Sequence, residues 1–183
     1  MIGADLRRLP PFELLRALER QLRGAPGDHG RPAGSAPPAW TGLAFRLRDQ
    51  RLLVPGDEIR EVTGRPRLTR VPGARDWLLG VANVRGSALP VTDLGALLDG
   101  GPAGEAREQR LLVLQQDGPP AAFLVDDVIG YRRFVPEDQR PSITAAPALQ
   151  PWRLGAFHRD GQDWLVLSLK RLARSDLFIR AGR

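Results

Sequence analysis

Cysteine is absent from this sequence, histidine occurs only twice, and lysine occurs once among 27 basic residues. The absence of cysteine excludes disulfides, thiolate nucleophiles and cysteine-ligated zinc. The two histidines, His29 and His158, fall in a Gly/Pro-rich stretch and in an expected hairpin turn, and neither has a plausible catalytic partner nearby in the sequence. We therefore predict that the protein is not an enzyme.

Long apolar runs are absent as well. No stretch approaches the roughly 18 uninterrupted apolar residues that a membrane-spanning helix needs. Residues 1–8 also lack the apolar run of a secretion signal. The sequence therefore predicts a cytoplasmic protein that does not insert into a membrane.

Basic residues exceed acidic ones, which gives a formal net charge of +6 and an isoelectric point near 11.1. Clustered cations bind nucleic-acid phosphates, but here the arginines are scattered along the chain. A nucleic-acid-binding small β-barrel protein is the alternative function, and it requires arginines gathered on one face with exposed aromatic side chains. The acidic pairs Asp126/Asp127 and Glu58/Glu61 lack metal-ligand spacing, so the sequence predicts neither a metal site nor a cofactor.

Composition divides the chain into four parts. Residues 11–23 place most of their apolar side chains on one side of a helix, so an amphipathic helix is expected within residues 1–23. Residues 24–39 are rich in Gly, Pro and Ala and predict a flexible linker. The rest predicts a folded domain at 40–176 and a tail at 177–183.

Beyond residue 40 the pattern is that of short strands. Leu43, Phe45 and Leu47 alternate with Ala44 and Arg46, and a turn then leads into an apolar run at 52–54, which predicts a hairpin. Many short strands separated by Gly and Pro predict a mainly β fold, with surface loops at 99–109 and 136–151. The further apolar runs lie at 77–84, 88–92, 110–115, 121–128, 154–158 and 164–168, with brief helical segments at 93–98 and 169–174.

The sequence also repeats itself. Residues 77–98 (WLLGVANVRGSALPVTDLGALL) align without a gap on residues 152–173 (WRLGAFHRDGQDWLVLSLKRLA), at a constant offset of 75 residues. A weaker match, at an offset of 70, joins 53–59 with 123–129. Each copy predicts a hairpin followed by strand, turn, strand and short helix, and two such units are expected to share an apolar seam. We expect the seam to provide a binding groove.

The second copy serves as a control for the hairpin turn of the first. Asp160 and Gly161 have ordinary hairpin-turn chemistry, whereas the first copy holds Arg85 and Gly86 at the same place. Because the turn forms without an arginine in one copy, Arg85 is not required for folding. Its guanidinium is therefore predicted to bind a partner's carboxylates or carbonyls.

The segment GVANVRGSALPVTDL, at 80–94, resembles the central signature of CheW-like domains. IREV at 59–62, LTRVP at 68–72 and FLVDDV at 123–128 extend the resemblance over roughly 40–174. Within that family the chain looks most like the branch that controls type IV pili and twitching motility. The resemblance implies a fold of two intertwined SH3-like five-stranded β-barrels with short helices.

The resemblance also implies a function, that of a non-enzymatic adaptor. Its partners would be the regulatory domain of a CheA-like histidine kinase and the cytoplasmic tip of a methyl-accepting chemoreceptor. The protein alone would be a monomer, cytoplasmic and recruited to membrane receptor arrays.

Partner-binding residues follow from the same resemblance, position by position. Arg70 and Trp77 are expected on the kinase side. The receptor side is expected to involve Ile59, Glu61, Gly80 and Arg85, with Val62 and Val84 lining the same surface. Read without the resemblance, Ile59 and Trp77 are core residues and Glu61 is a solvated side chain. The full set is Ile59, Glu61, Val62, Arg70, Trp77, Gly80, Asn83, Val84, Arg85 and Gly86.

A hydrolase is a third interpretation. It would need Ser87, His158 and Asp93 in one site, although no nucleophile elbow surrounds Ser87. Such an enzyme would have a deep pocket that holds His158 beside a carboxylate.

Overall fold

A computed structural model describes residues 39–101, 109–115 and 118–180. The helix expected at 11–23 and nearly all of the linker expected at 24–39 lie outside these residues, as does most of the loop expected at 99–109. The predictions for those segments stay predictions.

Ten strands and a few short helices make up the described part of the chain. The strands are β1 (Trp40–Leu47), β2 (Gln50–Pro55), β3 (Ile59–Gly64), β4 (Leu78–Val84), β5 (Ser87–Asp93), β6 (Arg110–Leu114), β7 (Ala122–Val125), β8 (Asp127–Phe134), β9 (Arg153–Arg159) and β10 (Gln162–Leu167). The α-helices are α2 (Leu94–Asp99), α3 (Leu169–Ala173) and α4 (Asp176–Ile179), and single 3-10 turns occur at η2 (Gly56–Glu58), η3 (Pro136–Asp138) and η4 (Gln150–Trp152).

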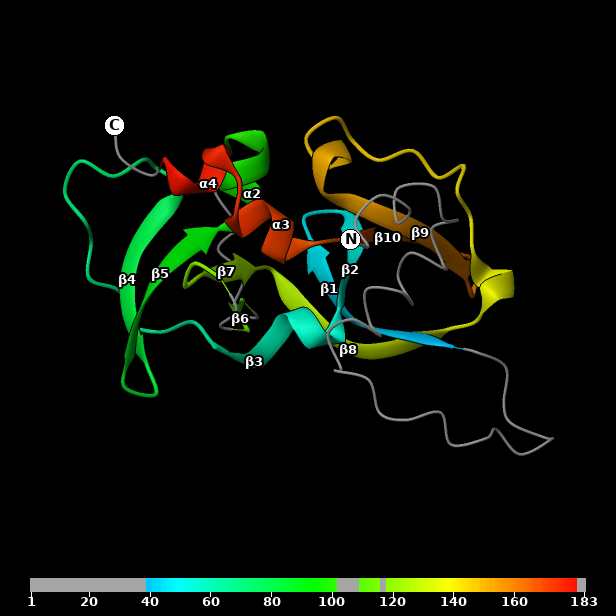
Figure 1. Cartoon of the computed structure of the whole chain (residues 1–183), viewed down its shortest axis with the longest axis horizontal. Helices are drawn as coiled ribbons and strands as arrows, with labels where there is room; N and C mark the ends of the chain where they lie inside the picture. Colours follow the sequence, from blue (N-terminus) through cyan, green and yellow to red (C-terminus); the bar gives the residue numbers. More distant parts are fainter. Residues whose placement is uncertain (1–38, 102–108, 116–117, 181–183) are drawn as a thin grey trace, which may run out of the picture.

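The strands form two five-stranded sheets that exchange strands between the two repeat units. Barrel A has the order β8-β1-β2-β10-β9, and barrel B has the order β3-β6-β7-β5-β4. The first unit supplies β1–β5 and the second β6–β10, so each barrel combines the first two strands of one unit with the last three of the other. Figure 1 shows barrel B on the left and barrel A on the right. The expected fold class, mainly β with two intertwined barrels, is confirmed.

The exchanged strands are buried on both faces. Leu43 and Phe45 of β1 pack with Phe123 of β7 in a cluster that joins the two barrels. The alternate residues of the same strands, such as Ala44 and Leu124, point into the interiors of barrel A and barrel B. Two-sided burial explains why β2, β6 and β7 are nearly continuous apolar runs in the sequence.

The seam between the barrels is therefore a packed core. Phe45 and Phe123 are fully buried in it, and burial of each such side chain stabilises the fold by roughly 1.5–3 kcal/mol. A polar contact adds to the seam, because the Arg48 guanidinium in the β1–β2 turn donates to the Gly101 carbonyl at 3.0 Å and lies 3.4 Å from the Asp99 carboxylate, just beyond barrel B. The binding groove that the sequence placed along the seam is filled by the protein's own side chains.

The repeat is preserved in the backbone hydrogen bonds. The amide of Asp93 donates to the Trp77 carbonyl at 2.9 Å, and the amide of Ser168, 75 residues later, donates to the Trp152 carbonyl at the same distance. Asp93 also caps α2 by accepting from the amide of Ala96, as Ser168 caps α3 by accepting from the amide of Arg171. The gapless alignment of the two copies therefore corresponds to a true structural equivalence.

Two expected boundaries differ in the structure. The strand expected at 121–128 is split into β7 and β8 at Asp126, whose carboxylate accepts from the amide of Arg48 while its own amide donates to the Arg46 carbonyl at 3.2 Å. This bend carries the chain from barrel B to barrel A. In the segment expected as a tail, Phe178 of α4 is buried and its ring centroid lies 5.5 Å from that of Phe123, so the core extends beyond residue 176.

A buried carboxylate ties the crossover between the barrels to α3. Glu58 lies in η2, where the chain passes from barrel A to barrel B, and its carboxylate accepts from the Ser168 hydroxyl at 2.6 Å and from the Lys170 amide at 3.0 Å. Burial raises the pKa of the Glu58 carboxyl, although these two hydrogen bonds act in the opposite direction. Burial in the folded protein therefore favours the protonated form of the Glu58 carboxyl.

This carboxylate should give the protein a measurable pH dependence. A raised folded-state pKa contributes stability below the unfolded pKa, about 4.3 for glutamate, and that contribution is lost as the pH rises through the folded pKa. We expect the free energy of unfolding of the wild type, relative to Glu58→Gln, to increase as the pH falls from neutral toward the unfolded pKa. Urea denaturation at a series of pH values measures this difference, and parallel curves for the two proteins would contradict it.

Candidate partner-binding surface

The β4–β5 hairpin presents Arg85 at its tip. Arg85 and Gly86 form the two-residue turn, with φ values of +51° and +83°, and the amide of Gly86 donates to the Asn83 side-chain oxygen at 2.8 Å. In the second repeat Asp160 and Gly161 adopt the same conformation, with φ values of +54° and +70°. The shared geometry supports the inference that the turn does not need an arginine.

Arg85 closes barrel B through an ion pair. Its Nε lies 2.5 Å from Oε2 of Glu61 on β3, and the other carboxylate oxygen of Glu61 accepts from Arg60 at 3.1 Å. The Arg85 side chain remains 82% exposed, whereas that of Glu61 is 15% exposed. Because β3 and β4 are the two edges of the barrel B sheet, the pair joins those edges and leaves most of the guanidinium open to solvent.

The other predicted contact residues divide into exposed and buried groups. The exposed group surrounds or adjoins the hairpin, and consists of Val62, Arg70, Asn83 and Gly86. The buried group lies in the core, and consists of Ile59, Trp77, Gly80 and Val84. Trp77 stacks on Phe178 with ring centroids 6.1 Å apart, so its position matches the interpretation of it as a core residue. A surface contact can use the first group and not the side chains of the second.

Gly80 has a structural reason to be glycine. Its φ is +146°, and a Cβ atom there would lie 2.4 Å from the Thr69 carbonyl oxygen. The chain approaches this closely because Thr69 and Val81 exchange two backbone hydrogen bonds of 2.9 and 2.8 Å. Gly80 thus holds the β3–β4 connection against β4.

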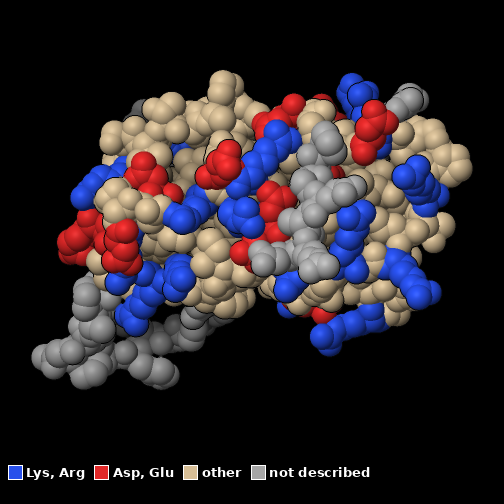
Figure 2. Space-filling view, turned by 180° about the vertical axis from the view of Figure 1, so that it is seen from behind, with Lys and Arg blue, Asp and Glu red and all other residues tan. Residues whose placement is uncertain are grey.

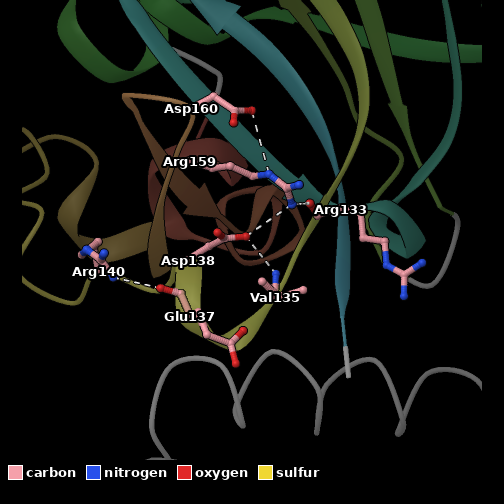
Figure 3. Close-up of polar contacts among 7 residues, drawn as sticks. All are labelled: Arg133, Val135, Glu137, Asp138, Arg140, Arg159 and Asp160. Atoms are coloured by element: carbon pink, nitrogen blue, oxygen red, sulfur yellow. Dashed lines mark hydrogen bonds and ion pairs between the residues drawn. The ribbon is translucent and has the colours of Figure 1, made fainter. Parts of the chain in front are cut away.

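Barrel A uses a different set of side chains at the equivalent place (Figure 3). Arg159 donates to the Arg133 carbonyl at 2.6 Å and lies 3.4 Å from the Asp138 carboxylate. Asp138 in turn accepts from the amide of Val135 at 3.0 Å. The Arg133 side chain points away from this cluster in Figure 3. The Arg159 cluster joins β8, η3 and the tip of the β9–β10 hairpin, so here the arginine beside the turn serves the fold.

His158 has a partner that the sequence analysis missed. Its Nδ1 lies 2.6 Å from the Asp163 carboxylate, directly across the β9–β10 ladder. The two-residue turn fixes this register and could have revealed the pair. The two side chains are 42% and 62% exposed and line a cavity of about 460 Å³ together with Thr144.

The three residues that the hydrolase interpretation required do not form one site. Ser87 and Asp93 are the two ends of β5 in barrel B, where Asp93 caps α2, whereas His158 lies on β9 of barrel A and pairs with Asp163. Within residues 39–101, 109–115 and 118–180, no cluster of three or more His, Cys, Asp or Glu side chains could hold a metal ion. No helix in the same residues is long and apolar enough to cross a membrane.

A family model for the CheW-like domain matches residues 41–177 of the chain. The sequence is 36% identical over 173 residues to protein PilI of Pseudomonas aeruginosa, an alignment that covers 92% of this chain and 94% of PilI. It is 33% identical over 129 residues to protein FrzA of Myxococcus xanthus, which covers 70% of this chain and 81% of FrzA.

The fold is similar to that of the scaffolding protein TtCheW from Thermoanaerobacter tengcongensis. The TM-score is 0.65 at 20% sequence identity, over 75% of this chain and 94% of TtCheW. The likeness shows a shared fold and agrees with the family match.

The close contact between Gly80 and Thr69 predicts that a methyl group at position 80 would strongly destabilise the protein. Gly80→Ala should destabilise the protein by about 2 kcal/mol or more, because strained backbone at positive φ costs 1–3 kcal/mol by itself and the methyl would also collide with Thr69. Gly64→Ala is the matched control, since a Cβ atom there would meet nothing within 4 Å. Thermal and urea unfolding of the two variants measure the difference. Equal stabilities would show that the Thr69–Val81 contact is dispensable.

Proposed function

The chain belongs to the CheW-like domain family, and we propose that it is a non-enzymatic scaffold that couples a methyl-accepting chemoreceptor to a CheA-like histidine kinase. The match to the family spans nearly all of the described residues. Similarity to PilI over almost the whole of both chains supports the branch of the family that controls type IV pili and twitching motility.

The exposed guanidinium of Arg85 is the observation that carries this proposal. A side chain that the turn conformation does not require, and that remains 82% exposed while it pairs with Glu61, is available to another protein. Arginine at such a place can bind carboxylates or backbone carbonyls through its fork of N–H donors. Val62 on neighbouring β3 is 38% exposed and adds an apolar contact beside it.

We assign the receptor contact to this end of barrel B. Glu61, Val62, Asn83, Arg85 and Gly86 would meet the tip of the receptor's coiled coil. The ion pair between Arg85 and Glu61 holds the hairpin in place before binding, so less conformational entropy is lost when the receptor arrives. Arg70, on the connection between β3 and β4, belongs to the kinase contact.

The mechanism we propose is coupling through simultaneous binding. A conformational change in the receptor changes the activity of the kinase because both are bound to one scaffold, and the coupling free energy acts in both directions. Each contact would be of modest size, on the order of 1,200–1,600 Å² in total, and an array would strengthen assembly through multivalency. We place the protein in the cytoplasm, as a monomer when alone, recruited to receptor arrays at the membrane.

Arg85→Asp tests the receptor contact. The new side chain is the one that the second repeat carries in the same turn, and loss of the exposed ion pair with Glu61 should cost little stability, so the fold should persist. The affinity for a receptor cytoplasmic fragment should fall by tenfold or more, about 1.4 kcal/mol. Circular dichroism would report the fold and a quantitative pull-down the affinity.

Arg132→Asp provides the control, because Arg132 is an exposed arginine on β8 of the other barrel and the charge change is identical. Loss of folding in Arg85→Asp would mean that the arginine is structural. An equal loss of affinity in both variants would mean that general charge, rather than the turn, attracts the receptor.

A further inference from the structure

The connection between β3 and β4 concentrates positive charge. Residues 65–77 carry four arginines and a single acid, Asp76, which gives a formal charge of +3. All four arginines are exposed. We call Arg65, Arg67, Arg70 and Arg75 the arginine strip.

The strip lies on a backbone that the fold holds in place. Figure 1 shows the connection running along the outer side of β4, at the left end of the molecule's long axis. Its middle is fixed to β4 by the two hydrogen bonds between Thr69 and Val81. Near its end, the Arg75 side chain donates to the Arg180 carbonyl at 3.2 Å. A strip held at both places presents its charges in a defined arrangement.

Two members of the strip have their guanidinium groups open to a partner. Arg65 donates to the Gln109 side chain at 2.8 Å, and Arg75 donates to the carbonyl of Arg180, which directly follows α4. Arg67 and Arg70 have neither a hydrogen-bond nor an ion-pair partner among the residues that the structure describes. Like charges along a short segment repel one another, and the fold tolerates this repulsion at a small cost in stability. Binding of an anionic partner would relieve the repulsion.

The second repeat shows that the fold does not require this charge. The equivalent connection of barrel A, between β8 and β9, spans residues 135–152 and carries Glu137, Asp138 and Arg140, a formal charge of −1. It is fixed to its barrel in a similar way, by a bridge between Gln139 and Phe157. The same structural task is performed without an excess of positive charge, so the task does not require Arg67 and Arg70, the two strip members without a partner among the described residues.

The surroundings of the strip favour a protein partner over a nucleic acid. Val71 within the strip is 41% exposed. Arginine is enriched at protein interfaces, and an exposed apolar side chain beside it offers surface that a protein partner can bury. Stacking on nucleic-acid bases needs exposed aromatic rings, and the large exposed aromatic in the described residues is Tyr131, on β8 of the other barrel.

The far face of the molecule agrees with this distribution. In Figure 2, turned so that barrel B lies on the right, basic side chains are spread over the lower right part with little acidic surface between them, whereas acidic and basic side chains mix on the left. On this face, the excess of positive charge lies toward the barrel B end of the molecule.

We infer that the arginine strip is a docking surface for an acidic segment of the kinase-side partner. This rests on the proposed function for the identity of the partner, and on the strip itself for the chemistry of recognition. Aspartate and glutamate side chains of the partner would bind Arg67 and Arg70, with Val71 packed against an apolar residue beside them. Opposite charges at such a surface accelerate association and orient the partner.

Arg67→Gln/Arg70→Gln in the full-length chain tests this inference. Binding would be measured to two probes, a CheA-like regulatory domain from the same genome and a short polyglutamate peptide, at about 50 mM and about 300 mM salt. The matched control is Arg132→Gln/Arg133→Gln, which removes the same charge from exposed positions on β8. We expect the strip variant to bind both probes at least tenfold more weakly at low salt and to lose most of the salt dependence, and the control to stay within about threefold of the wild type.

The outcomes separate the inference from the proposed function. If the strip variant and the control bind both probes equally well, the inference is wrong and the kinase contact lies elsewhere. If the wild type binds no kinase domain at either salt concentration, the kinase side of the proposed function fails, and the peptide alone then decides whether the strip recognises acidic protein segments. Binding of a labelled oligonucleotide that depends on Arg67 and Arg70, without binding of the peptide, would assign the strip to nucleic acid instead.

Discussion

The packing of two exchanged hairpins against each other is the interaction on which the rest of the structure depends. Leu43 and Phe45 of β1 meet Phe123 of β7 in the seam, while the opposite faces of the same strands complete two separate barrel interiors. Because each barrel borrows two strands from the other unit, neither can form without the seam. The outer edges, β3 with β4 and β8 with β9, are then free to differ.

The outer edges of the two barrels share a backbone geometry but differ in charge. In barrel B an exposed arginine at the turn pairs with Glu61, and the connection before β4 is strongly basic. In barrel A the turn holds Asp160, Arg159 beside it is engaged with Asp138, and the equivalent connection is slightly acidic. The two repeat units thus share one backbone geometry but carry unlike surfaces, and both proposed contacts use the basic edge of barrel B.

Much of this arrangement could be predicted from the sequence, and the exceptions share a cause. The alternation at Leu43–Leu47 and the repeat at 77–98 indicated the strands, the two-residue turns and the availability of Arg85, because these are local features. The pairing of Arg85 with Glu61, the close approach of Thr69 to Gly80 and the filled seam all depend on which strands lie side by side. Strand exchange determines which strands are neighbours, and no local sequence pattern indicates that exchange. The His158–Asp163 pair, in contrast, could have been predicted from the sequence, because the register of a two-residue turn places these residues opposite each other.

The exchange of hairpins also bears on how the chain could be divided. A break between α2 and β6 would leave one piece with β1–β5 and another with β6–β10, and each piece would hold two strands of one barrel and three of the other. Neither piece could bury its own apolar strands, so both would expose them to water. Mixed together, the two pieces would supply each other's missing strands. Because each barrel needs both halves of the chain, the intact protein is stable as one cooperative unit rather than as two successive domains.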